Sequence, residues 1–423
     1  MPSALRPNSE VVLTAEKPVT GGRMLARHDG QVVFVAGAIP GERVRARVER
    51  VSKQLAFAET VEVLDCSPDR RSAGVDWACG GSLYAHIAYE RQRVLKSELI
   101  ADAFARIGKM QLPGPVPVMA SEEQGYRMRA RLHAQSGMFG FFREGTHELC
   151  GAGPTRQLLP ATLNALEHLQ TALSDAAITG VTSCEISENA GASERVALIE
   201  MAPSLRAPLH FGPVAGITGA VFADHQSARL AVAYGSPYVV DAIDGPGGAV
   251  TLTHHVQSFF QSNRYLLSPL VARLLAHVPD GSVTDLYAGV GLFSVSLAAR
   301  GVGRIVAVEG DRSSVRDLES NAEAYGAAIR VEHASVENYL GGGGVAKPDT
   351  LVLDPPRTGV SSEALSGILG LKPPRLVYLS CDLATVARDV RRLVEAGYSL
   401  SHIEAFDLFP NTAHVETLVV LVT

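Results

Sequence analysis

A cysteine near the C-terminus, Cys381, has the sequence context of a nucleophile. It ends a strand predicted over residues 375–381 and precedes a predicted helix, DLATVARDVRRL, for which Asp382 is the expected N-cap. At a helix N-terminus, backbone N–H groups and the helix dipole stabilise a thiolate, the reactive form of cysteine. A lone cysteine is otherwise most often a small buried hydrophobic residue, and only its neighbours at this sheet edge favour the reactive role.

Glu416 is the carboxylate expected beside that thiol. It starts a strand predicted over residues 415–423, which is joined to a strand predicted over 400–409 by only Pro-Asn-Thr-Ala-His. A connection this short cannot be a parallel crossover, so the final strand must run antiparallel to its neighbour. The strand then begins at the edge where parallel strands end, and Glu416 reaches the pocket of Cys381. The alternative is a charge that faces water on an edge strand.

A thiolate and a carboxylate in one pocket suit methylation at carbon 5 of uracil. That carbon is a poor nucleophile until a thiolate adds at carbon 6 and produces an enolate. Once carbon 5 has accepted a methyl group, a carboxylate can remove its proton as a general base. Two alternatives are open: an amino-directed nucleic-acid methyltransferase, which needs no cysteine, and an RNA-binding or chaperone protein that has lost catalysis.

A candidate cofactor site precedes these residues in the chain. A strand predicted over 283–289 runs into Gly289-Val-Gly291 and a helix, and the next predicted strand, over 304–311, contains Glu309. Glycines allow close backbone approach, and a distal acid can accept hydrogen bonds from ribose hydroxyls. Because a third glycine and a phosphate-binding run are missing, the pattern favours S-adenosylmethionine over a dinucleotide. A structural turn followed by a solvated glutamate is the alternative.

Asp354 is expected in the same crevice. The strand predicted over 349–356 must stop at Pro355-Pro356, because proline cannot continue a sheet ladder. Ligands of open parallel sheets bind outside the carboxyl ends of the strands, so Asp354 is predicted to lie beside Gly289 and Glu309. A tight structural turn is the alternative.

The elements that must position these residues alternate between strand and helix from about residue 252. The alternation predicts an α/β fold: a Rossmann-like domain over 252–423 with a mostly parallel sheet and an antiparallel last strand. Residues 1–65, with short β-branched runs between Gly and Pro-Gly turns, predict a small antiparallel, OB-like β-barrel that is expected to bind RNA, with a spacer as the alternative. Residues 66–251 predict a mixed α+β domain whose helix over 86–108 is expected to pack on the C-terminal domain.

Composition limits the class of protein. The 423 residues suit two or three globular domains, and no apolar run is long enough to span a membrane. The five cysteines are odd in number and widely spread, which predicts free thiols, a reducing compartment and a cytoplasmic protein. The net charge is −6, but residues 1–131 hold 19 Lys and Arg against 15 Asp and Glu, and this part is expected to contact RNA phosphates. Uneven surface charge without a function is the alternative.

Six motifs occur in the order in which one protein family carries them. They are SFFQSN (258–263), DLYAGVGLF (285–293), VEGD (308–311), LDPPRTGV (353–360), YLSCDLATVARD (378–389) and FPNTAHVE (409–416). The chain thereby resembles the RNA (uracil-5-)-methyltransferases of the TrmA/RumA type. Residues 21–44 look like part of the TRAM domain that many members carry, so the resemblance covers nearly the whole chain.

The resemblance implies a role for each matched residue. S-adenosylmethionine would contact Gln261, Tyr287, Glu309 and Asp354, while Cys381 would be the nucleophile and Glu416 the base that removes the proton. The target uridine would be flipped out of its stack into the pocket. RNA is the expected partner, with 23S ribosomal RNA favoured over transfer RNA because TRAM-bearing relatives commonly act there. No membrane and no obligate protein partner is expected.

The chain departs from the family at an iron–sulfur cluster that many TRAM-bearing members bind through four cysteines. In VDWACGGSLYAH (75–86) only Cys79 matches clearly, while Ser82 stands at the third ligand and Thr155 aligns with the last. Serine is a poor substitute for a thiolate. Neither a cluster nor a metal ion is therefore expected, with an irregular set of Cys66, Cys79 and Cys150 as the alternative.

Overall fold

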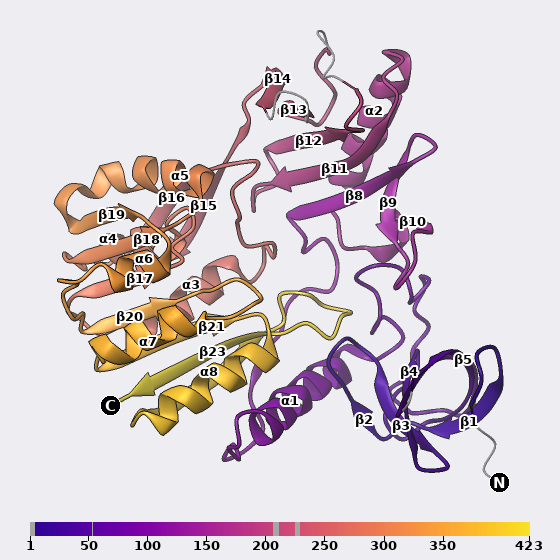
Figure 1. The fold of residues 1–423 in the computed structure, drawn as a ribbon. Coiled ribbons are helices and arrows are strands. Elements are labelled where there is room, and N and C mark those ends of the chain that lie inside the picture. Colours follow the sequence, from indigo (N-terminus) through magenta and orange to yellow (C-terminus); the bar gives the residue numbers. More distant parts are fainter. Residues whose placement is uncertain (1–4, 53, 206–210, 225–228) are drawn as a thin grey trace.

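The computed structural model describes residues 5–52, 54–205, 211–224 and 229–423. These residues form three large β-sheets and a two-stranded hairpin. Figure 1 shows the N-terminal sheet in indigo at the lower right, the central sheet at the upper right and the C-terminal sheet on the left. No helix in these ranges is both long enough and apolar enough to cross a membrane.

The N-terminal sheet has the strand order β1-β5-β6-β4-β3-β2. Its strands are β1 (Glu10–Thr14), β2 (Lys17–Pro18), β3 (Met24–His28), β4 (Gln31–Ala36), β5 (Arg43–Val51) and β6 (Leu55–Asp65). Side chains of β5 alternate between buried and exposed, as expected when successive residues point to opposite faces. The predicted antiparallel pairing is confirmed for four of the five strand pairs, whereas β4 and β6 pair in parallel.

Helix α1 (Tyr89–Arg106) lies between the N-terminal and C-terminal sheets (Figure 1). Its buried apolar side chains recur at helical spacing, which gives the helix one apolar face. Leu95 packs into the core of the N-terminal sheet, whereas Leu99 and Phe104 pack in the core that also holds Val386 and Val390 of the C-terminal region. The helix therefore joins two hydrophobic cores.

The central sheet has the order β10-β9-β8-β11-β12-β13-β14. Its strands are β8 (Arg129–Gln135), β9 (Met138–Phe142), β10 (Leu149–Gly151), β11 (Val181–Glu188), β12 (Arg195–Met201), β13 (Gly219–Asp224) and β14 (Arg229–Gly235). A 3₁₀ turn, η1 (Gly153–Thr155), precedes helix α2 (Pro160–Asp175), whose Leu166 and Leu169 pack on this sheet. The hairpin β15 (Tyr238–Gly245) and β16 (Gly248–His255) then leads to the C-terminal sheet.

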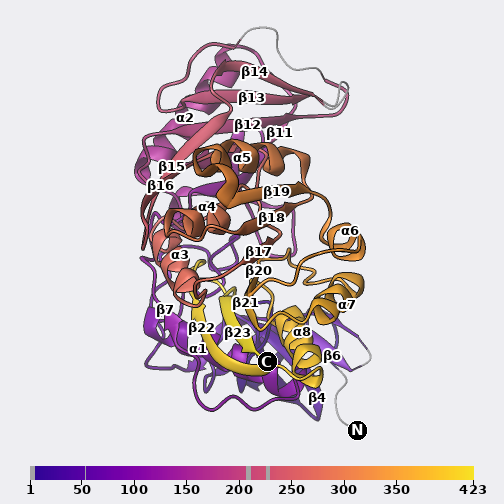
Figure 2. The same ribbon diagram turned by 90° about the vertical axis from the view of Figure 1, so that its left-hand side faces the viewer.

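The C-terminal sheet has the order β19-β18-β17-β20-β21-β23-β22-β7 and carries helices on both faces (Figure 2). Its strands are β7 (Val118–Met119), β17 (Val283–Leu286), β18 (Ile305–Glu309), β19 (Ile329–His333), β20 (Thr350–Leu353), β21 (Arg375–Ser380), β22 (Ser399–Phe406) and β23 (Glu416–Val422). The helical segments are α3 (Leu267–Ala276), α4 (Leu292–Ala299), α5 (Arg312–Ala322), η2 (Glu323–Ala328), α6 (Val336–Gly341), α7 (Ser362–Leu371) and α8 (Leu383–Glu395).

The pairing of this sheet confirms the predicted α/β fold. Strands β17, β18, β20 and β21 are parallel, whereas β23 runs antiparallel to both β21 and β22, as the short connection required. Strands β19 and β7 were not predicted. Strand β7 comes from the segment predicted to form the central domain, yet it pairs with β22 of the C-terminal sheet. The predicted domain boundaries at residues 65 and 251 therefore stay a prediction.

The prediction that the five cysteines are free thiols is wrong for two of them. Cys79 and Cys150 are joined in a disulfide, with their Cα atoms 5.9 Å apart and a sequence separation of 71. Cys150 lies in β10, and an isolated bridge from Cys79 to Arg143 brings the two segments together at the end of β9. Cys66, Cys184 and Cys381 are free.

Candidate active site

Cys381 and Glu416 lie opposite each other at one edge of the C-terminal sheet. The last residue of β21, Ser380, is paired with Thr417 of β23. The next position of this antiparallel register sets Cys381 against Glu416. The predicted helix cap is confirmed, since the side chain of Asp382 accepts a hydrogen bond at 2.8 Å from a backbone N–H in the first turn of α8. The structure thus brings the thiol and the carboxyl group together.

The surroundings of Cys381 disfavour the thiolate, despite its position at a helix N-terminus. Burial raises the pKa of the thiol to about 11, Glu416 and Asp354 add to the rise, and Arg357 opposes it. Burial also raises the pKa of Glu416 well above its usual value, with Asp354 acting in the same direction and Arg357 against it. In the free protein at neutral pH, the thiolate is therefore the minor form of Cys381.

Asp354 follows β20 and lies among polar side chains. Its Oδ2 accepts a hydrogen bond from Nε2 of Gln261 at 3.5 Å. Burial raises the pKa of Asp354 to about 7, and the carboxyl group of Asp285 on the adjacent strand β17 adds to the rise. Burial also raises the pKa of Asp285 to about 7, although Ser294 donates a hydrogen bond to its Oδ2 at 2.5 Å. The other oxygen of Asp285, Oδ1, is buried without a hydrogen-bond partner among the described residues.

The turn after β17 exposes backbone and fixes Glu309. Tyr287, Gly289 and Gly291 have positive φ angles of 63°, 58° and 96°. In the described part of the chain, a side chain added at Gly289 would meet no atom within 4 Å, so this face of the turn is open. The N–H of Gly289 donates to Oε2 of Glu309 at 2.7 Å, and the N–H of Asp311 donates to Oε1 at 2.6 Å. The carboxylate predicted to bind a ribose is thus held against the glycine turn.

This arrangement fits S-adenosylmethionine. Each carboxylate oxygen can accept two hydrogen bonds, so Glu309 keeps lone pairs for ribose hydroxyls. The open glycine turn allows close approach of a ligand. All eight predicted site residues lie at this one edge of the sheet: Gln261, Tyr287, Gly289, Gly291, Glu309, Asp354, Cys381 and Glu416.

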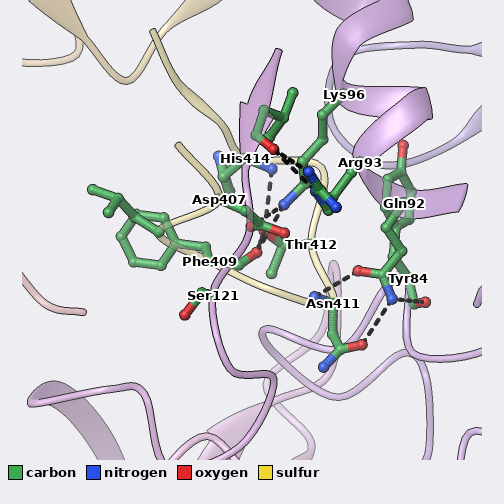
Figure 3. A network of polar contacts seen from close by, with 12 residues as sticks. Tyr84, Gln92, Arg93, Lys96, Ser121, Asp407, Phe409, Asn411, Thr412 and His414 are labelled. Atoms are coloured by element: carbon green, nitrogen blue, oxygen red, sulfur yellow. Dashed lines mark hydrogen bonds and ion pairs between the residues drawn. The ribbon is translucent and has the colours of Figure 1, made fainter. Parts of the chain in front are cut away.

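Helix α1 holds the loop that leads into Glu416 (Figure 3). The fully buried Lys96 forms an ion pair with Asp407 and donates a hydrogen bond at 3.1 Å to the backbone carbonyl two residues further on. One turn earlier in α1, the amide of Gln92 donates to Oδ1 of Asn411 at 2.9 Å and accepts from the N–H of the same residue at 2.9 Å. A helix more than 300 residues away in sequence therefore positions this loop.

Replacing Lys96 with methionine is expected to lower the free energy of unfolding by about 3–5 kcal/mol, because Asp407 would become a buried charge without its partner. Burial lowers the pKa of Lys96 and Asp407 opposes that effect, so the ammonium group depends on this carboxylate. Urea denaturation followed by circular dichroism measures the change.

The matched control is the double variant Lys96→Met/Asp407→Asn, which removes both charges. It is expected to recover at least about 2 kcal/mol of the loss, because no charge is then left unpaired. If the loss of unfolding free energy in the double variant equals the sum of the losses in the two single variants, Lys96 and Asp407 are not a coupled buried pair.

Alkylation of Cys381 by iodoacetamide is expected to accelerate by about tenfold per pH unit between about pH 7 and pH 9, since the thiolate fraction rises steadily below the raised pKa. Arg357→Ala should slow the reaction at each pH, because the arginine lowers the pKa of this thiol. Glu416→Gln should accelerate it, because the glutamate raises that pKa. Mass spectrometry of the alkylated peptide measures the rate.

Cys66 provides the internal control because it is exposed and lies far from these groups in sequence. Its alkylation rate should not change in either variant. A rate at Cys381 that is independent of pH, or two variants that shift it in the same direction, would argue against this electrostatic description.

Three residues around this site were not predicted. Asp285 could have been identified from the sequence, because an acidic residue within a buried strand usually has a specific partner or role. Lys96 could also have been identified, since it shares the apolar face of α1 with Leu99 and Ile100. Arg357 stands in the LDPPR motif, but nothing in its spacing indicated that it faces Cys381.

The region around Cys79 does not fit an iron–sulfur cluster. Its thiol is joined to that of Cys150, while Ser82 and Thr155, which align with two cluster ligands, offer hydroxyl groups. Cys66 is exposed, and its thiol donates to the neighbouring backbone carbonyl. Clusters of this kind are held by thiolates, and the remaining donors do not supply such a set.

Two family models match parts of the chain. One is described as tRNA (Uracil-5-)-methyltransferase and matches residues 346–423, which include Asp354, Cys381 and Glu416. The other is described as the TRAM domain and matches residues 8–61, which form most of the N-terminal sheet.

Individual proteins are similar over nearly the full length. An uncharacterised RNA methyltransferase of Thermosynechococcus vestitus is 32% identical over 95% of this chain and 95% of its own. The 23S rRNA (uracil(1939)-C(5))-methyltransferases RlmD of Halomonas elongata and Pseudomonas putida are 33% and 31% identical, over 95% and 96% of this chain and 87% and 92% of theirs. The tRNA (uracil-54, C5)-methyltransferase of Pyrococcus abyssi, solved with S-adenosyl-L-homocysteine, has the same fold, with a TM-score of 0.76, 23% identity and coverage of 97% and 99% of the two chains.

Proposed function

Because this chain belongs to the S-adenosylmethionine-dependent RNA (uracil-5-)-methyltransferase family, we propose that Cys381 and Glu416 carry its reaction and that its substrate is 23S ribosomal RNA. One observation carries the assignment of the two residues. They face each other across β21 and β23, at the sheet edge where Asp354 and the glycine turn also lie. The paired thiol and carboxyl group match the two chemical demands of methylation at carbon 5.

The methyl donor would be held by the glycine turn and its neighbours. Glu309, fixed by the N–H of Gly289, would accept hydrogen bonds from the ribose hydroxyls. Gln261 and Asp354 would supply polar contacts beside the reacting centre, and Tyr287 would form one wall of the site. When bound, S-adenosylmethionine supplies an electrophilic methyl group on a sulfonium.

Cys381 would act first. Its sulfur adds to carbon 6 of the uracil, a carbon–sulfur bond forms, and the ring becomes an enolate that is nucleophilic at carbon 5. The thiol of the partly exposed Cys381 first releases its proton to solvent, because the thiolate that adds is the minor form of this side chain in the free protein. Arg357 favours the negative charge on the sulfur. Carbon 5 then accepts the methyl group.

Glu416 would complete the reaction. Its carboxylate, on the strand that faces Cys381, removes the proton from carbon 5. The electron pair of that carbon–hydrogen bond restores the ring double bond, and the bond between carbon 6 and the sulfur breaks. Burial and Asp354 raise the pKa of Glu416, which makes its carboxylate a stronger base than a solvent-exposed one.

The choice of 23S ribosomal RNA is supported by the two RlmD relatives, which are more similar to this chain than the tRNA enzyme of Pyrococcus abyssi is. The uridine equivalent to position 1939 in the names of those relatives is the proposed target. The N-terminal TRAM domain would contribute RNA contacts, since Arg50 stacks over the ring of Phe57 at 3.7 Å and arginine–aromatic surfaces suit nucleic acids.

Purified protein tests the proposal by transfer of labelled methyl groups to separate 23S ribosomal RNA and transfer RNA samples that lack 5-methyluridine. Label is expected in 23S RNA, at a single uridine located by mass spectrometry of nuclease fragments. Label in transfer RNA alone would overturn the ribosomal assignment but keep the chemistry. Label only on adenine or on protein would overturn both.

A further inference from the structure

Four side chains outside the active site meet between the C-terminal turn of α3 and strand β22, which lie side by side in Figure 2. Arg273 and His277 are four residues apart and share one side of the helix end, while His402 and Glu404 are two residues apart and share one face of the strand. Glu404 is buried, whereas both imidazoles retain partial exposure. The methylation chemistry uses none of these four residues.

The distances between the imidazoles and the carboxylate are unusual for hydrogen bonds. Oε1 of Glu404 lies 3.4 Å from Nε2 of His277 and 3.3 Å from Nε2 of His402. An N–H···O hydrogen bond normally spans about 2.7–3.2 Å, so both contacts are long. Nε2 of His402 is buried and has no hydrogen-bond partner in the described ranges of the chain. The three ligand atoms lie within 4.8 Å of one another.

These separations suit ligands that share a metal ion. Zinc–nitrogen and zinc–oxygen bonds of about 2.0–2.1 Å in a tetrahedron set neighbouring ligand atoms about 3.3–3.4 Å apart. The two distances from Oε1 to the imidazole nitrogens therefore match the spacing between ligand atoms around a tetrahedral zinc ion. Two imidazoles and one carboxylate are also a ligand set that zinc and neighbouring divalent transition metals accept.

Arg273 contacts the carboxylate of Glu404 and holds its orientation. Its Nη2 and Nε lie 2.8 Å and 2.9 Å from Oε2 of Glu404, and Nε also lies 3.2 Å from Oε1, the oxygen that faces the two imidazoles. Such outer contacts orient metal ligands in proteins.

We propose that His277, His402 and Glu404 form a binding site for one divalent transition metal ion of the zinc type, with water at the fourth position. The ion would link α3 to β22 and stabilise that border of the C-terminal sheet. The cationic Arg273 on the same carboxylate limits the affinity, so the site is expected to bind in the micromolar range rather than more tightly.

Calorimetric titration of the full-length, chelator-treated protein with Zn²⁺ tests this site. One ion is expected to bind per chain, and His277→Gln and His402→Gln should each weaken binding by at least about tenfold. The matched control is His168→Gln, which changes an exposed histidine on α2. It should bind as the unaltered protein does. Zn²⁺ should also raise the melting temperature of the protein but not that of the two site variants.

Titration with Co²⁺ distinguishes this site from the free thiols. Nitrogen and oxygen ligands in a tetrahedron give visible absorption bands without the ultraviolet charge-transfer band of a thiolate. A thiolate band that Cys381→Ala or Cys66→Ala removes would place the ion elsewhere and overturn the proposal. Unchanged Zn²⁺ affinity in either histidine variant would overturn it as well. Circular dichroism of the metal-free variants identifies any loss of folding, and Glu404→Gln then provides a third ligand variant.

Discussion

Replacing Cys381 with alanine is expected to reduce methyl transfer to RNA by at least about 1,000-fold, because carbon 5 of the uracil would no longer be activated by addition at carbon 6. Cys381→Ser should be nearly as inactive, since a hydroxyl group is a much weaker nucleophile than a thiolate. Single-turnover transfer of labelled methyl groups measures both losses. Binding of S-adenosylmethionine should be unchanged, because Glu309 and the glycine turn belong to other strands.

Cys66→Ala is the matched control for this result. Cys66 is also a free cysteine, but it is exposed and follows the N-terminal sheet, so its variant should methylate RNA at the unaltered rate. Full activity in Cys381→Ala would contradict a covalent mechanism and favour amino-directed methylation, which needs no thiol. Loss of S-adenosylmethionine binding in Cys381→Ala would indicate a damaged fold instead.

Much of the sheet edge that carries Cys381 and Glu416 was predictable because local sequence rules determine it. Pro355-Pro356 end a strand wherever they occur, so the position of Asp354 at a carboxyl end required no tertiary information. The five residues between the last two strands excluded a parallel crossover, and the observed antiparallel β23 places Glu416 accordingly. These features depend on chain geometry within a few residues.

Features that depend on long-range contacts were missed or misjudged. Strand β7 has two residues and forms only because β22 offers an unpaired edge. The disulfide between Cys79 and Cys150 depends on a bridge to the end of β9 that spacing does not reveal. The helix position of Cys381 suggested a stabilised thiolate, but burial beside Glu416 outweighs it, and neither effect can be weighed without the three-dimensional surroundings.

The Glu416→Gln variant is expected to stop the reaction after methyl transfer. Glutamine keeps the shape of the side chain but cannot accept the proton from carbon 5, so the bond between Cys381 and carbon 6 cannot break. Repeated turnover should fall by about 100- to 10,000-fold. A covalent protein–RNA species that carries the labelled methyl group should accumulate, and a denaturing gel detects it as a slowly migrating band that nuclease removes.

The amount of trapped label separates this role from a general loss of activity. With Glu416 as the base, up to one methyl group per chain is transferred and retained, whereas a variant with a distorted site would transfer none. Cys381→Ala/Glu416→Gln should abolish the band, because the bond to RNA requires the thiol. Glu395→Gln, at an exposed position at the end of α8, should behave as the unaltered protein. If RNA leaves Glu416→Gln at the normal rate, another group removes the proton, and Asp354, whose pKa burial raises to about 7, is the next carboxyl group at this edge.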